Sequence, residues 1–439
     1  MKQGGFDAVI GNPPWGATFA EHELQYLRTK HSAVIDRMVD SYIYFLDVAI
    51  SLTKQSGTTG FIVPGTIINQ TDASSVRRRL LDRELSVLVN LGKGVFGTHV
   101  LNTSVILVAT ATKPGALLQV DDLTRLPSVH SLEGLRSLPW GVWKKLCLQD
   151  PHSTFFIGDP GAAGLLGRLR SEFPPLSAAL DGGIQRGVTP DIAQAHVLSE
   201  EDARVASIEN ELLRPSISGP AIKRYAPARP DSFIIYTTRA TSVDRYPRAL
   251  EHLGRYRHLN GCSEVAEGKH PWWALHRPRT PQVFDSPKLI GLTTSKSIAL
   301  VLDADSSLYV TDAMYVFKTL PDYDALAVMA VLQSRAFHFL YRTANQGQSR
   351  VIPQVKASKL EPLPLPAAAC RTEGGNRALR DLASQMLRLT AQVPRVGTEH
   401  ERVVLQRQID ATDRKIDELV YELYGLTDEE MRIVTETTR

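Results

Sequence analysis

Short apolar runs alternate with helix-like stretches over the first 113 residues of the chain. Residues 6–10 form an apolar run that stops at Gly11, and residues 60–63 form another that stops at Pro64. Both runs have the length and the flanks of buried strands. Strands that alternate with helices are typical of a parallel α/β sheet covered on both faces. The predicted strands are 6–10, 60–63, 85–91 and 103–110, and the predicted helices are 41–54 and 73–83.

The pattern weakens between residues 114 and 179, where seven prolines separate short apolar pieces. Proline fixes its own φ angle and lacks an N–H donor, so this region predicts a linker with one short helix over 161–170. Many short β-like runs follow, among them 233–236 and 307–310, and residues 323–341 have the spacing of a helix.

The end of the chain is helical. Apolar residues recur at helical spacing over 377–389. Thr398 and Glu401 have the spacing of a capping box, which opens a second helix that ends at Gly425. A short turn between the two helices predicts a helical hairpin.

The composition is that of an ordinary globular protein. Hydrophobic residues make up 43% and charged residues 22% of the 439 residues, and no run of about 18 apolar residues occurs, so we expect no membrane span. Cys147, Cys262 and Cys370 lie far apart, which fits a reducing cytoplasm and predicts neither a disulfide framework nor a metal site. The formal net charge of +3 says little about partners, so charge is examined locally.

The most specific chemical signal in the sequence is a tetrapeptide that follows the first predicted strand. It consists of Asn12, Pro13, Pro14 and Trp15. The two prolines remove two N–H donors and leave the Pro13 carbonyl as an outward acceptor, and the Asn12 amide supplies a second carbonyl. Two acceptors beside the flat Trp15 ring suit a planar heterocycle with an exocyclic amino group. The alternative is a plain turn after a strand, with Trp15 packed into the core.

Residues 6–15 resemble the catalytic motif of amino-methyltransferases that use S-adenosylmethionine. The following motifs resemble those of gamma-class adenine-specific DNA methyltransferases, most closely the carboxyl-terminal part of fused restriction-modification or phage-defence methylases. Later segments resemble their target-recognition domain. The matching segments are 41–46, 60–64, 95–100 and 102–107, and then 214–219, 222–225, 332–335 and 360–366.

This resemblance implies an α/β fold with a partial Rossmann-like methyltransferase sheet, followed by an α+β target-recognition domain and a C-terminal helical hairpin. The expected parts are the carboxyl-terminal half of the catalytic domain over 1–125, a linker over 126–180, the DNA target-recognition domain over 181–366 and a helical region over 367–439.

The resemblance also implies a reaction, in which S-adenosylmethionine methylates the 6-amino group of an adenine flipped out of double-stranded DNA. Asn12 and the Pro13 carbonyl would accept hydrogen bonds from that amino group, and Pro14 would fix the backbone beside them. Trp15 and Phe96 would pack on the flipped base. Taken alone, Phe96 is expected in the core rather than on a base.

The chain departs from the family at its start. In the family, a Gly-rich turn and an acidic residue that hold the cofactor precede the Asn-Pro-Pro motif, whereas eleven residues precede Asn12 here. We therefore expect about four strands of a seven-stranded sheet and an exposed apolar edge at residues 6–10. A separate polypeptide, a late start or a gene remnant would account for the other half. The isolated chain should bind cofactor poorly and have little activity.

Residues 204–296 have the local charge of a DNA-binding region, with 15 Lys and Arg against 8 Asp and Glu. Basic and aromatic residues alternate in it, as in surfaces that contact phosphates and base edges, although a solvated basic face is the alternative. The basic run 77–79 is a further candidate, or a solvated helix face. The DNA-contact candidates are Arg255, Arg257, Arg277, Arg279, Gln346 and Arg350.

The leading hypothesis is an adenine-specific DNA methyltransferase of a restriction-modification or phage-defence system, truncated or split. The main alternative is a non-catalytic specificity module that recognises DNA for a partner enzyme. A methyltransferase acting on RNA or on a protein glutamine is a third possibility, which the long basic region disfavours. No acidic-lysine cluster typical of a restriction nuclease is found in the sequence.

Overall fold

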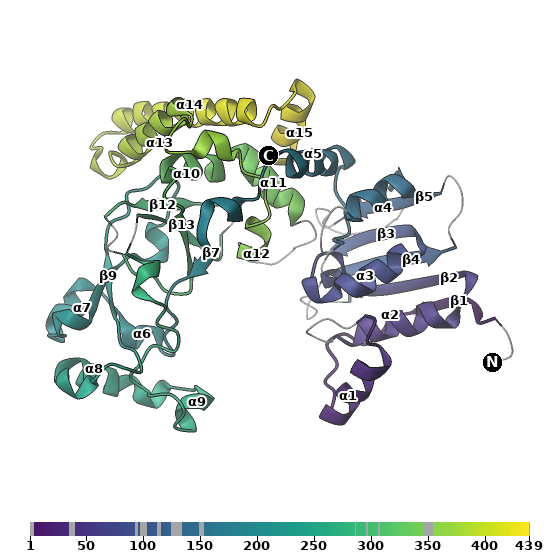
Figure 1. The fold of residues 1–439 in the computed structure, drawn as a ribbon, viewed down its shortest axis with the longest axis horizontal. Coiled ribbons are helices and arrows are strands. Elements are labelled where there is room, and N and C mark those ends of the chain that lie inside the picture. The colour runs from purple at the N-terminus through teal and green to yellow at the C-terminus, as the bar shows by residue number, and fades with distance from the viewer. Residues whose placement is uncertain are drawn as a thin grey trace. The chain divides into compact units, whose positions relative to one another are not determined.

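The computed structural model describes residues 4–34, 40–92, 95–96, 103–111, 116–123, 134–148, 153–285, 287–295, 297–305, 308–345 and 354–438. The chain divides into two compact units (Figure 1). The first unit is Met1–Arg168 with Arg342–Val351, and the second is Leu169–Tyr341 with Ile352–Arg439. Each unit has its own sheets and its own apolar core.

A six-stranded sheet forms the centre of the first unit, in the order β1-β2-β4-β3-β5-β6. The strands are β1 (Phe6–Gly11), β2 (Thr53–Pro64), β3 (Glu84–Gly92), β4 (Ser104–Thr110), β5 (Leu117–Asp122) and β6 (Arg136–Pro139). The helices up to the boundary are α1 (Glu21–Lys30), α2 (Ser41–Leu52), α3 (Ser74–Leu81), α4 (Trp140–Leu148) and α5 (Pro160–Glu172). Helices α3 and α4 lie on one face of the sheet (Figure 1).

This sheet is mixed, whereas the sequence predicted a parallel one. β1 pairs with β2 and β3 pairs with β5 in parallel, but β4 is antiparallel to both of its neighbours. Residues 93–103 are all that separate β3 from β4. A parallel connection needs a crossover of about a dozen residues or more, usually a helix, so this short connection leads back beside β3 in the opposite direction.

Part of the predicted linker belongs to the sheet unit, which therefore has six strands rather than four. β6 pairs with β5, and α4 packs on the same sheet. Trp140 and Trp143 stack with ring centroids 5.5 Å apart, and Trp143 and Phe155 are fully buried. The apolar pieces between the prolines therefore form core, and the two units divide at Arg168 rather than at residue 180.

The basic run 77–79 was a candidate for DNA contact or for a solvated helix face, but Arg77 belongs to the core. Its side chain is fully buried and donates hydrogen bonds to the carbonyls of Ile67, Gln70 and Ser153 at 2.8–3.0 Å. One guanidinium thus satisfies three backbone acceptors that would otherwise lose their partner. Of the basic run, Arg78 is exposed and Arg79 pairs with Asp47.

We expect Arg77→Met to lower the free energy of unfolding of the first unit by about 3 kcal/mol, because it leaves buried carbonyls without a donor. The matched change Arg78→Met, at an exposed position of the same helix, should cost less than about 1 kcal/mol. The free energy of unfolding of the first unit is measured by urea titration of the whole chain. Hydrogen exchange in the peptides that cover residues 64–90 reports on this unit alone. Equal effects of the two substitutions would contradict the structural role of Arg77.

The second unit contains two sheets, in the orders β8-β10-β9 and β12-β11-β13-β7. Its strands are β7 (Leu180–Arg186), β8 (Val197–Leu198), β9 (Leu213–Ser216), β10 (Ser232–Ile235), β11 (Lys288–Leu292), β12 (Leu300–Asp303) and β13 (Met314–Thr319). Its shorter helices are α6 (Ala193–His196), α7 (Glu200–Val205), α8 (Pro247–Tyr256), α9 (Ser263–Ala266) and α12 (Ala357–Leu360). The others are α10 (Ala325–Gln333), α11 (Arg335–Ala344), α13 (Arg377–Thr390), α14 (Glu399–Leu423) and α15 (Asp428–Thr438).

Residues 323–341 form α10 and α11 rather than the one predicted helix. Ser334 between them has an extended backbone, with φ −70° and ψ 158°. Of the run 307–310, the described residues 308–310 contribute a single bridge at Tyr309 rather than a strand.

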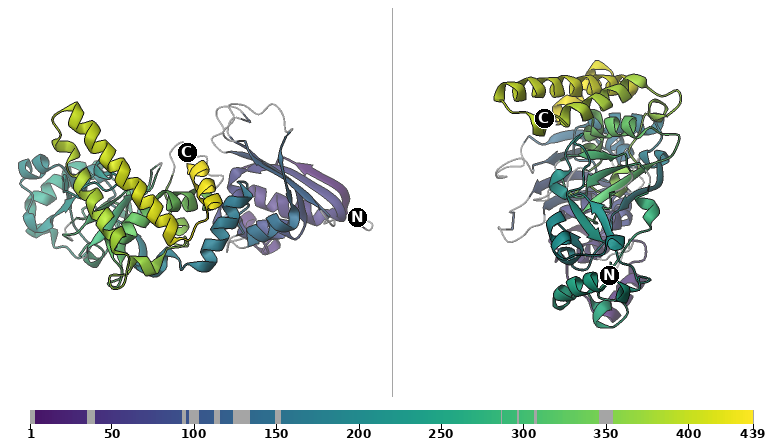
Figure 2. Two further views of the ribbon diagram at one scale, coloured as in Figure 1. Left: turned by 90° about the horizontal axis from the view of Figure 1, so that it is seen from above. Right: turned by 90° about the vertical axis from the view of Figure 1, so that its left-hand side faces the viewer.

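The predicted helical hairpin is confirmed, and it supports the second unit. α13 and α14 lie side by side and both contact α10 (Figures 1 and 2). The Thr398 and Glu401 side chains each accept the other's backbone N–H at 3.2 Å, as a capping box does. Arg224 donates two hydrogen bonds to Asp413 of α14, at 2.6 and 3.0 Å. A forked pair of this kind fixes the orientation of the hairpin.

Candidate functional site

The loop after β1 is held in place by the start of α2. The Pro14 carbonyl accepts a hydrogen bond from Ser41 Oγ at 2.5 Å, and the Gly16 N–H donates to Asp40 Oδ1 at 3.0 Å. Asp40 and Ser41 are residue types that commonly cap a helix, but the Asp40 side chain makes no cap bond to α2. The polar pair instead fixes the conformation of the Asn12–Trp15 loop.

Two carbonyl acceptors of this loop, on Asn12 and Pro13, are unpaired among the described residues. Asn12 is exposed, and neither its side chain nor the Pro13 carbonyl has a hydrogen-bond partner among the described residues. Pro13 is buried beneath them, which gives the loop a rigid base. The structure thus places both sequence-predicted acceptors at the end of an edge strand, without a hydrogen-bond partner among the described residues.

The rings of Trp15 and Phe96 lie in contact. Their ring centroids lie 5.4 Å apart and the ring planes are at 85°, an edge-to-face arrangement. Trp15 is partly buried against the core, whereas Phe96 is 44% exposed and so is not the core residue that its sequence context alone suggested. Two perpendicular rings form a corner, in which a planar molecule can stack on one ring and meet the edge of the other.

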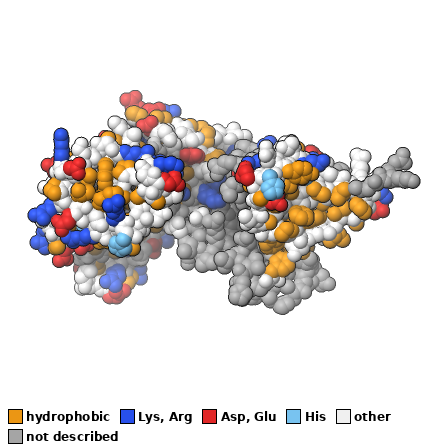
Figure 3. Space-filling model, turned by 90° about the horizontal axis from the view of Figure 1, so that it is seen from below, with side chains coloured by type: hydrophobic (Ala, Val, Ile, Leu, Met, Phe, Trp, Pro, Cys, Tyr) orange, Lys and Arg blue, Asp and Glu red, His pale blue; other side chains and the backbone are white. Residues whose placement is uncertain are grey.

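An open apolar edge lies beside this corner. β1 is the edge strand of the sheet, with Ile10 83% and Phe6 53% exposed, which confirms the predicted exposed edge. Tyr26 of α1 and Phe45 and Val48 of α2 are also exposed. Figure 3 shows apolar side chains gathered over the first unit in the view from below. An edge strand with unpaired backbone groups and apolar neighbours is a surface that another strand can extend.

The four described arginine candidates lie in the second unit, in different environments. Arg255 is exposed and pairs with Glu251 at 2.8 Å, whereas Arg257 lies over the Trp272 ring at 5.1 Å. Arg277 is exposed and has no ion-pair partner among the described residues. Arg279 donates from Nε to the Gly187 carbonyl at 3.2 Å. Gln346 and Arg350 lie outside the described residues.

Arg279 has an unusual backbone for a non-glycine residue, with φ at +59°. Its carbonyl accepts a hydrogen bond from Tyr236 Oη at 2.7 Å, which holds that conformation. Partial burial, and then the nearby Arg277, lower the pKa of the Arg279 guanidinium, which still stays charged at neutral pH. Arg279 is thus a positioned residue, and Arg277 is the freer charge beside it.

Sequence reasoning missed the residues that position the loop. The segment 41–46 is predicted as a motif and a helix start, but Asp40 and Ser41 show no pattern that links them to residues 24 or more positions earlier. The usable signal was two adjacent polar residues before a buried helix, which normally indicates a cap.

Two ranges of the chain are similar to known protein families. Residues 1–96 match the family described as Eco57I restriction-modification methylase, and residues 214–365 match the family described as TaqI-like C-terminal specificity domain. These two ranges are therefore similar to a restriction-modification methylase and to a specificity domain, and they are called the methylase segment and the specificity domain below. The Asn12–Trp15 loop and Phe96 lie in the methylase segment, and the four described arginines lie in the specificity domain.

Individual relatives extend over nearly the whole chain. This chain is 23% identical over 483 aligned residues to the type II restriction enzyme and methyltransferase RM.Eco57I of Escherichia coli. The alignment covers 98% of this chain and 47% of the relative. The fold resembles that of the type IIL restriction-modification enzyme MmeI, solved in complex with DNA, with a TM-score of 0.61 and 11% identity over 98% of this chain and 56% of that one. The chain spans about half the length of these relatives.

None of the helices in the described ranges combines the length and the apolar sequence that crossing a membrane requires.

Proposed function

We propose that the methylase segment transfers a methyl group from S-adenosylmethionine to the 6-amino group of adenine in double-stranded DNA, within a restriction-modification or phage-defence system. The observation that carries this proposal is the pair of free carbonyl acceptors, on Asn12 and Pro13, beside the perpendicular rings of Trp15 and Phe96. An adenine offers both features that this corner would recognise, a flat ring and an amino group with two N–H donors.

The geometry favours a simple division of roles. The Asn12 amide oxygen and the Pro13 carbonyl accept the two N–H bonds, which turns the nitrogen lone pair away from the loop. Trp15 and Phe96 replace the stacking that the base loses when it leaves the duplex. Stacking of a base on an aromatic side chain stabilises the bound state by about 1–3 kcal/mol. Positioning of the amino group, rather than a general base, then lowers the barrier.

S-adenosylmethionine, when bound, supplies the methyl group. The acceptors and rings of the Asn12–Trp15 loop suit the base that receives the methyl group rather than the cofactor itself. We propose that a preceding methyltransferase half, on the same polypeptide or a separate one, provides the cofactor-binding residues. Support comes from the exposed β1 edge and from the relatives, which are about twice as long as this chain.

The specificity domain would supply the DNA contacts. Arg277 is the described candidate whose charge is least engaged, whereas Arg255 is already paired with Glu251. We expect Arg277→Ala to weaken DNA binding and to reduce the slope of log K against log salt by about 1, because one phosphate contact is lost. The matched change Arg255→Ala should leave this slope nearly unchanged. Fluorescence anisotropy at several salt concentrations measures both slopes, and equal slopes for the two variants would contradict the assignment.

The base specificity is tested by identifying the product. The chain assembled with its preceding half is incubated with labelled cofactor and unmethylated DNA, and the DNA is hydrolysed to nucleosides. We expect the label in N6-methyladenine. Label in methylcytosine, or only in RNA or a protein glutamine offered in parallel, would contradict the proposal. The non-catalytic alternative is not favoured, because residues 1–96 match a methylase family.

A further inference from the structure

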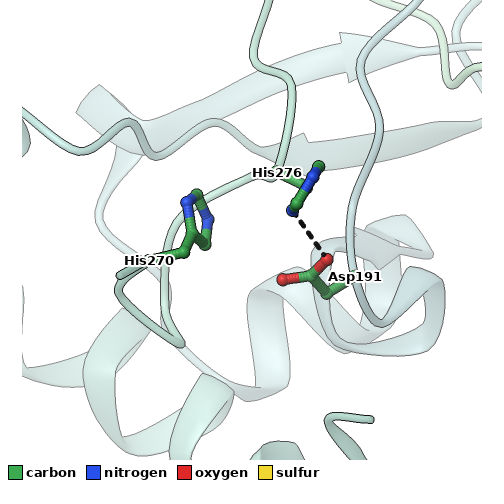
Figure 4. A group of neighbouring side chains, drawn as sticks. All are labelled: Asp191, His270 and His276. Atoms are coloured by element: carbon green, nitrogen blue, oxygen red, sulfur yellow. Dashed lines mark ion pairs between the residues drawn. The ribbon is translucent and has the colours of Figure 1, made fainter. Parts of the chain in front are cut away.

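Three side chains with metal-binding donor atoms, Asp191, His270 and His276, lie together in the second unit beside Arg277, and Cys262 lies next to His276. They come from two stretches that are far apart in the sequence. Asp191 lies between β7 and α6, whereas Cys262, His270 and His276 follow α8. Figure 4 shows His276 directed at the Asp191 carboxylate, with His270 on the opposite side of the group.

A backbone bridge fixes the two stretches against each other. The Thr189 N–H donates to the Arg277 carbonyl at 2.9 Å, and the Arg277 N–H donates to the Thr189 carbonyl at 3.1 Å. This antiparallel pairing places Asp191 next to His276. The cluster is therefore set by the fold of the domain and not by long, freely rotating side chains.

The donor atoms converge on His276. Its Nδ1 lies 3.2 Å from Asp191 Oδ1 and 3.9 Å from Cys262 Sγ. The ligand atoms of Asp191, His270 and His276 all lie within 4.8 Å of one another. Tetrahedral zinc sets its ligand atoms about 3.3–3.8 Å apart, so the two distances at His276 lie close to this range, and His270 and Cys262 move toward the other donors when the ion binds.

The Asp191 carboxylate is the part of the cluster that favours a cation. His270 is 3% exposed and the Asp191 side chain is 12% exposed. The second carboxylate oxygen, Asp191 Oδ2, is buried and has no hydrogen-bond partner among the described residues. A buried carboxylate oxygen without a partner is unfavourable, and a bound cation removes that penalty.

His270 has partners that a metal would replace in part. Its Nδ1 accepts a hydrogen bond from Arg239 Nε at 2.9 Å, and its Nε2 donates to the Ala274 carbonyl at 3.2 Å. Arg239 also pairs with Glu264 at 3.4 Å, so it keeps a partner when the Nδ1 lone pair turns to a metal. The bond to Ala274 then orients the ring, as the second nitrogen of a metal-bound histidine usually does.

We propose that Asp191, Cys262, His270 and His276 bind Zn²⁺. One thiolate and one carboxylate carry two negative charges, which balance the ion, and the two imidazoles bind as neutral donors. Four protein donors make a closed site, which is structural rather than catalytic. The ion would tie the loop after β7 to the segment between α8 and Arg277, and so fix the part of the domain that carries Arg277 and Arg279.

The test uses the full chain without an affinity tag, stripped of metal and kept reduced. Zn²⁺ is titrated against a chromophoric chelator, and Co²⁺ serves as a spectroscopic probe. We expect one Zn²⁺ per chain, a Tm that rises with Zn²⁺ concentration, and a thiolate-to-Co²⁺ charge-transfer band. His276→Ala should weaken binding by roughly 100-fold or more. Cys262→Ser should remove the charge-transfer band, and His258→Ala, an exposed histidine nearby, should change nothing.

Cys262 is only partly buried, so Cys262→Ser should keep the metal-free Tm of the parent chain, and it tests the site even where His276→Ala, which removes the ion-pair partner of Asp191, lowers that Tm. The absence of stoichiometric Zn²⁺ binding by the folded parent would overturn the proposal. So would binding that His276→Ala and Cys262→Ser leave unchanged.

Discussion

Asn12→Ala should lower methyl transfer by at least about 100-fold in the assembled enzyme while DNA affinity stays within about twofold. Asn12 supplies one of the two acceptors that would orient the target amino group, and the loss of one preorganised polar contact in an active site has effects of that size. Its side chain is exposed and makes no hydrogen bond to the described residues, so the fold should be unaffected. Single-turnover methylation and DNA-binding titrations on the same preparation separate the two effects.

Thr18→Ala is the matched control for this substitution, because Thr18 is an exposed polar residue of the same connection between β1 and α1. It should keep full methylation. If Asn12→Ala weakened DNA binding as much as it slowed methylation, the role given to Asn12 would be wrong.

Ile10→Glu should prevent assembly with the preceding methyltransferase half, weakening the association by more than about tenfold. Ile10 is 83% exposed on the edge strand β1, and pairing of that edge would bury it. A carboxylate buried without a partner in an apolar interface costs several kcal/mol, or forces the interface apart. Size-exclusion chromatography with light scattering measures assembly, and methylation should fall in parallel.

Leu117→Glu is the control for a charge on the same sheet. Leu117 is 57% exposed on β5, which lies toward the other side of the sheet from β1. This variant should assemble like the parent chain. Equal assembly of the Ile10→Glu and Leu117→Glu variants would exclude the β1 edge as the docking surface.

The features that the sequence predicted best were those with a local pattern. A short apolar run before Asn12 predicted β1, and the spacing of Thr398 and Glu401 predicted the start of α14. The family resemblance implied that Trp15 and Phe96 serve the same base, and no local pattern links two residues so far apart, so their ring contact is information that only the structure provides.

The features that the sequence did not predict are those that depend on long-range packing. The direction of β4 follows from its neighbours in the sheet, and a buried strand has the same apolar pattern in either direction. Arg77 lies in a basic run that is typical of a solvated face, yet it binds three buried carbonyls. Asp191 is 71 residues before Cys262, so their donors come together only in the folded domain.

The central claim is that this chain provides the base-binding loop and the DNA specificity, and that a preceding half completes the cofactor site. The most direct test is methyl transfer from labelled S-adenosylmethionine to unmethylated DNA, with the chain alone and with the chain mixed with or fused to the product encoded immediately upstream. The account predicts methylation only in the second case. Robust methylation by the chain alone would contradict it, as would DNA binding without methylation in both cases.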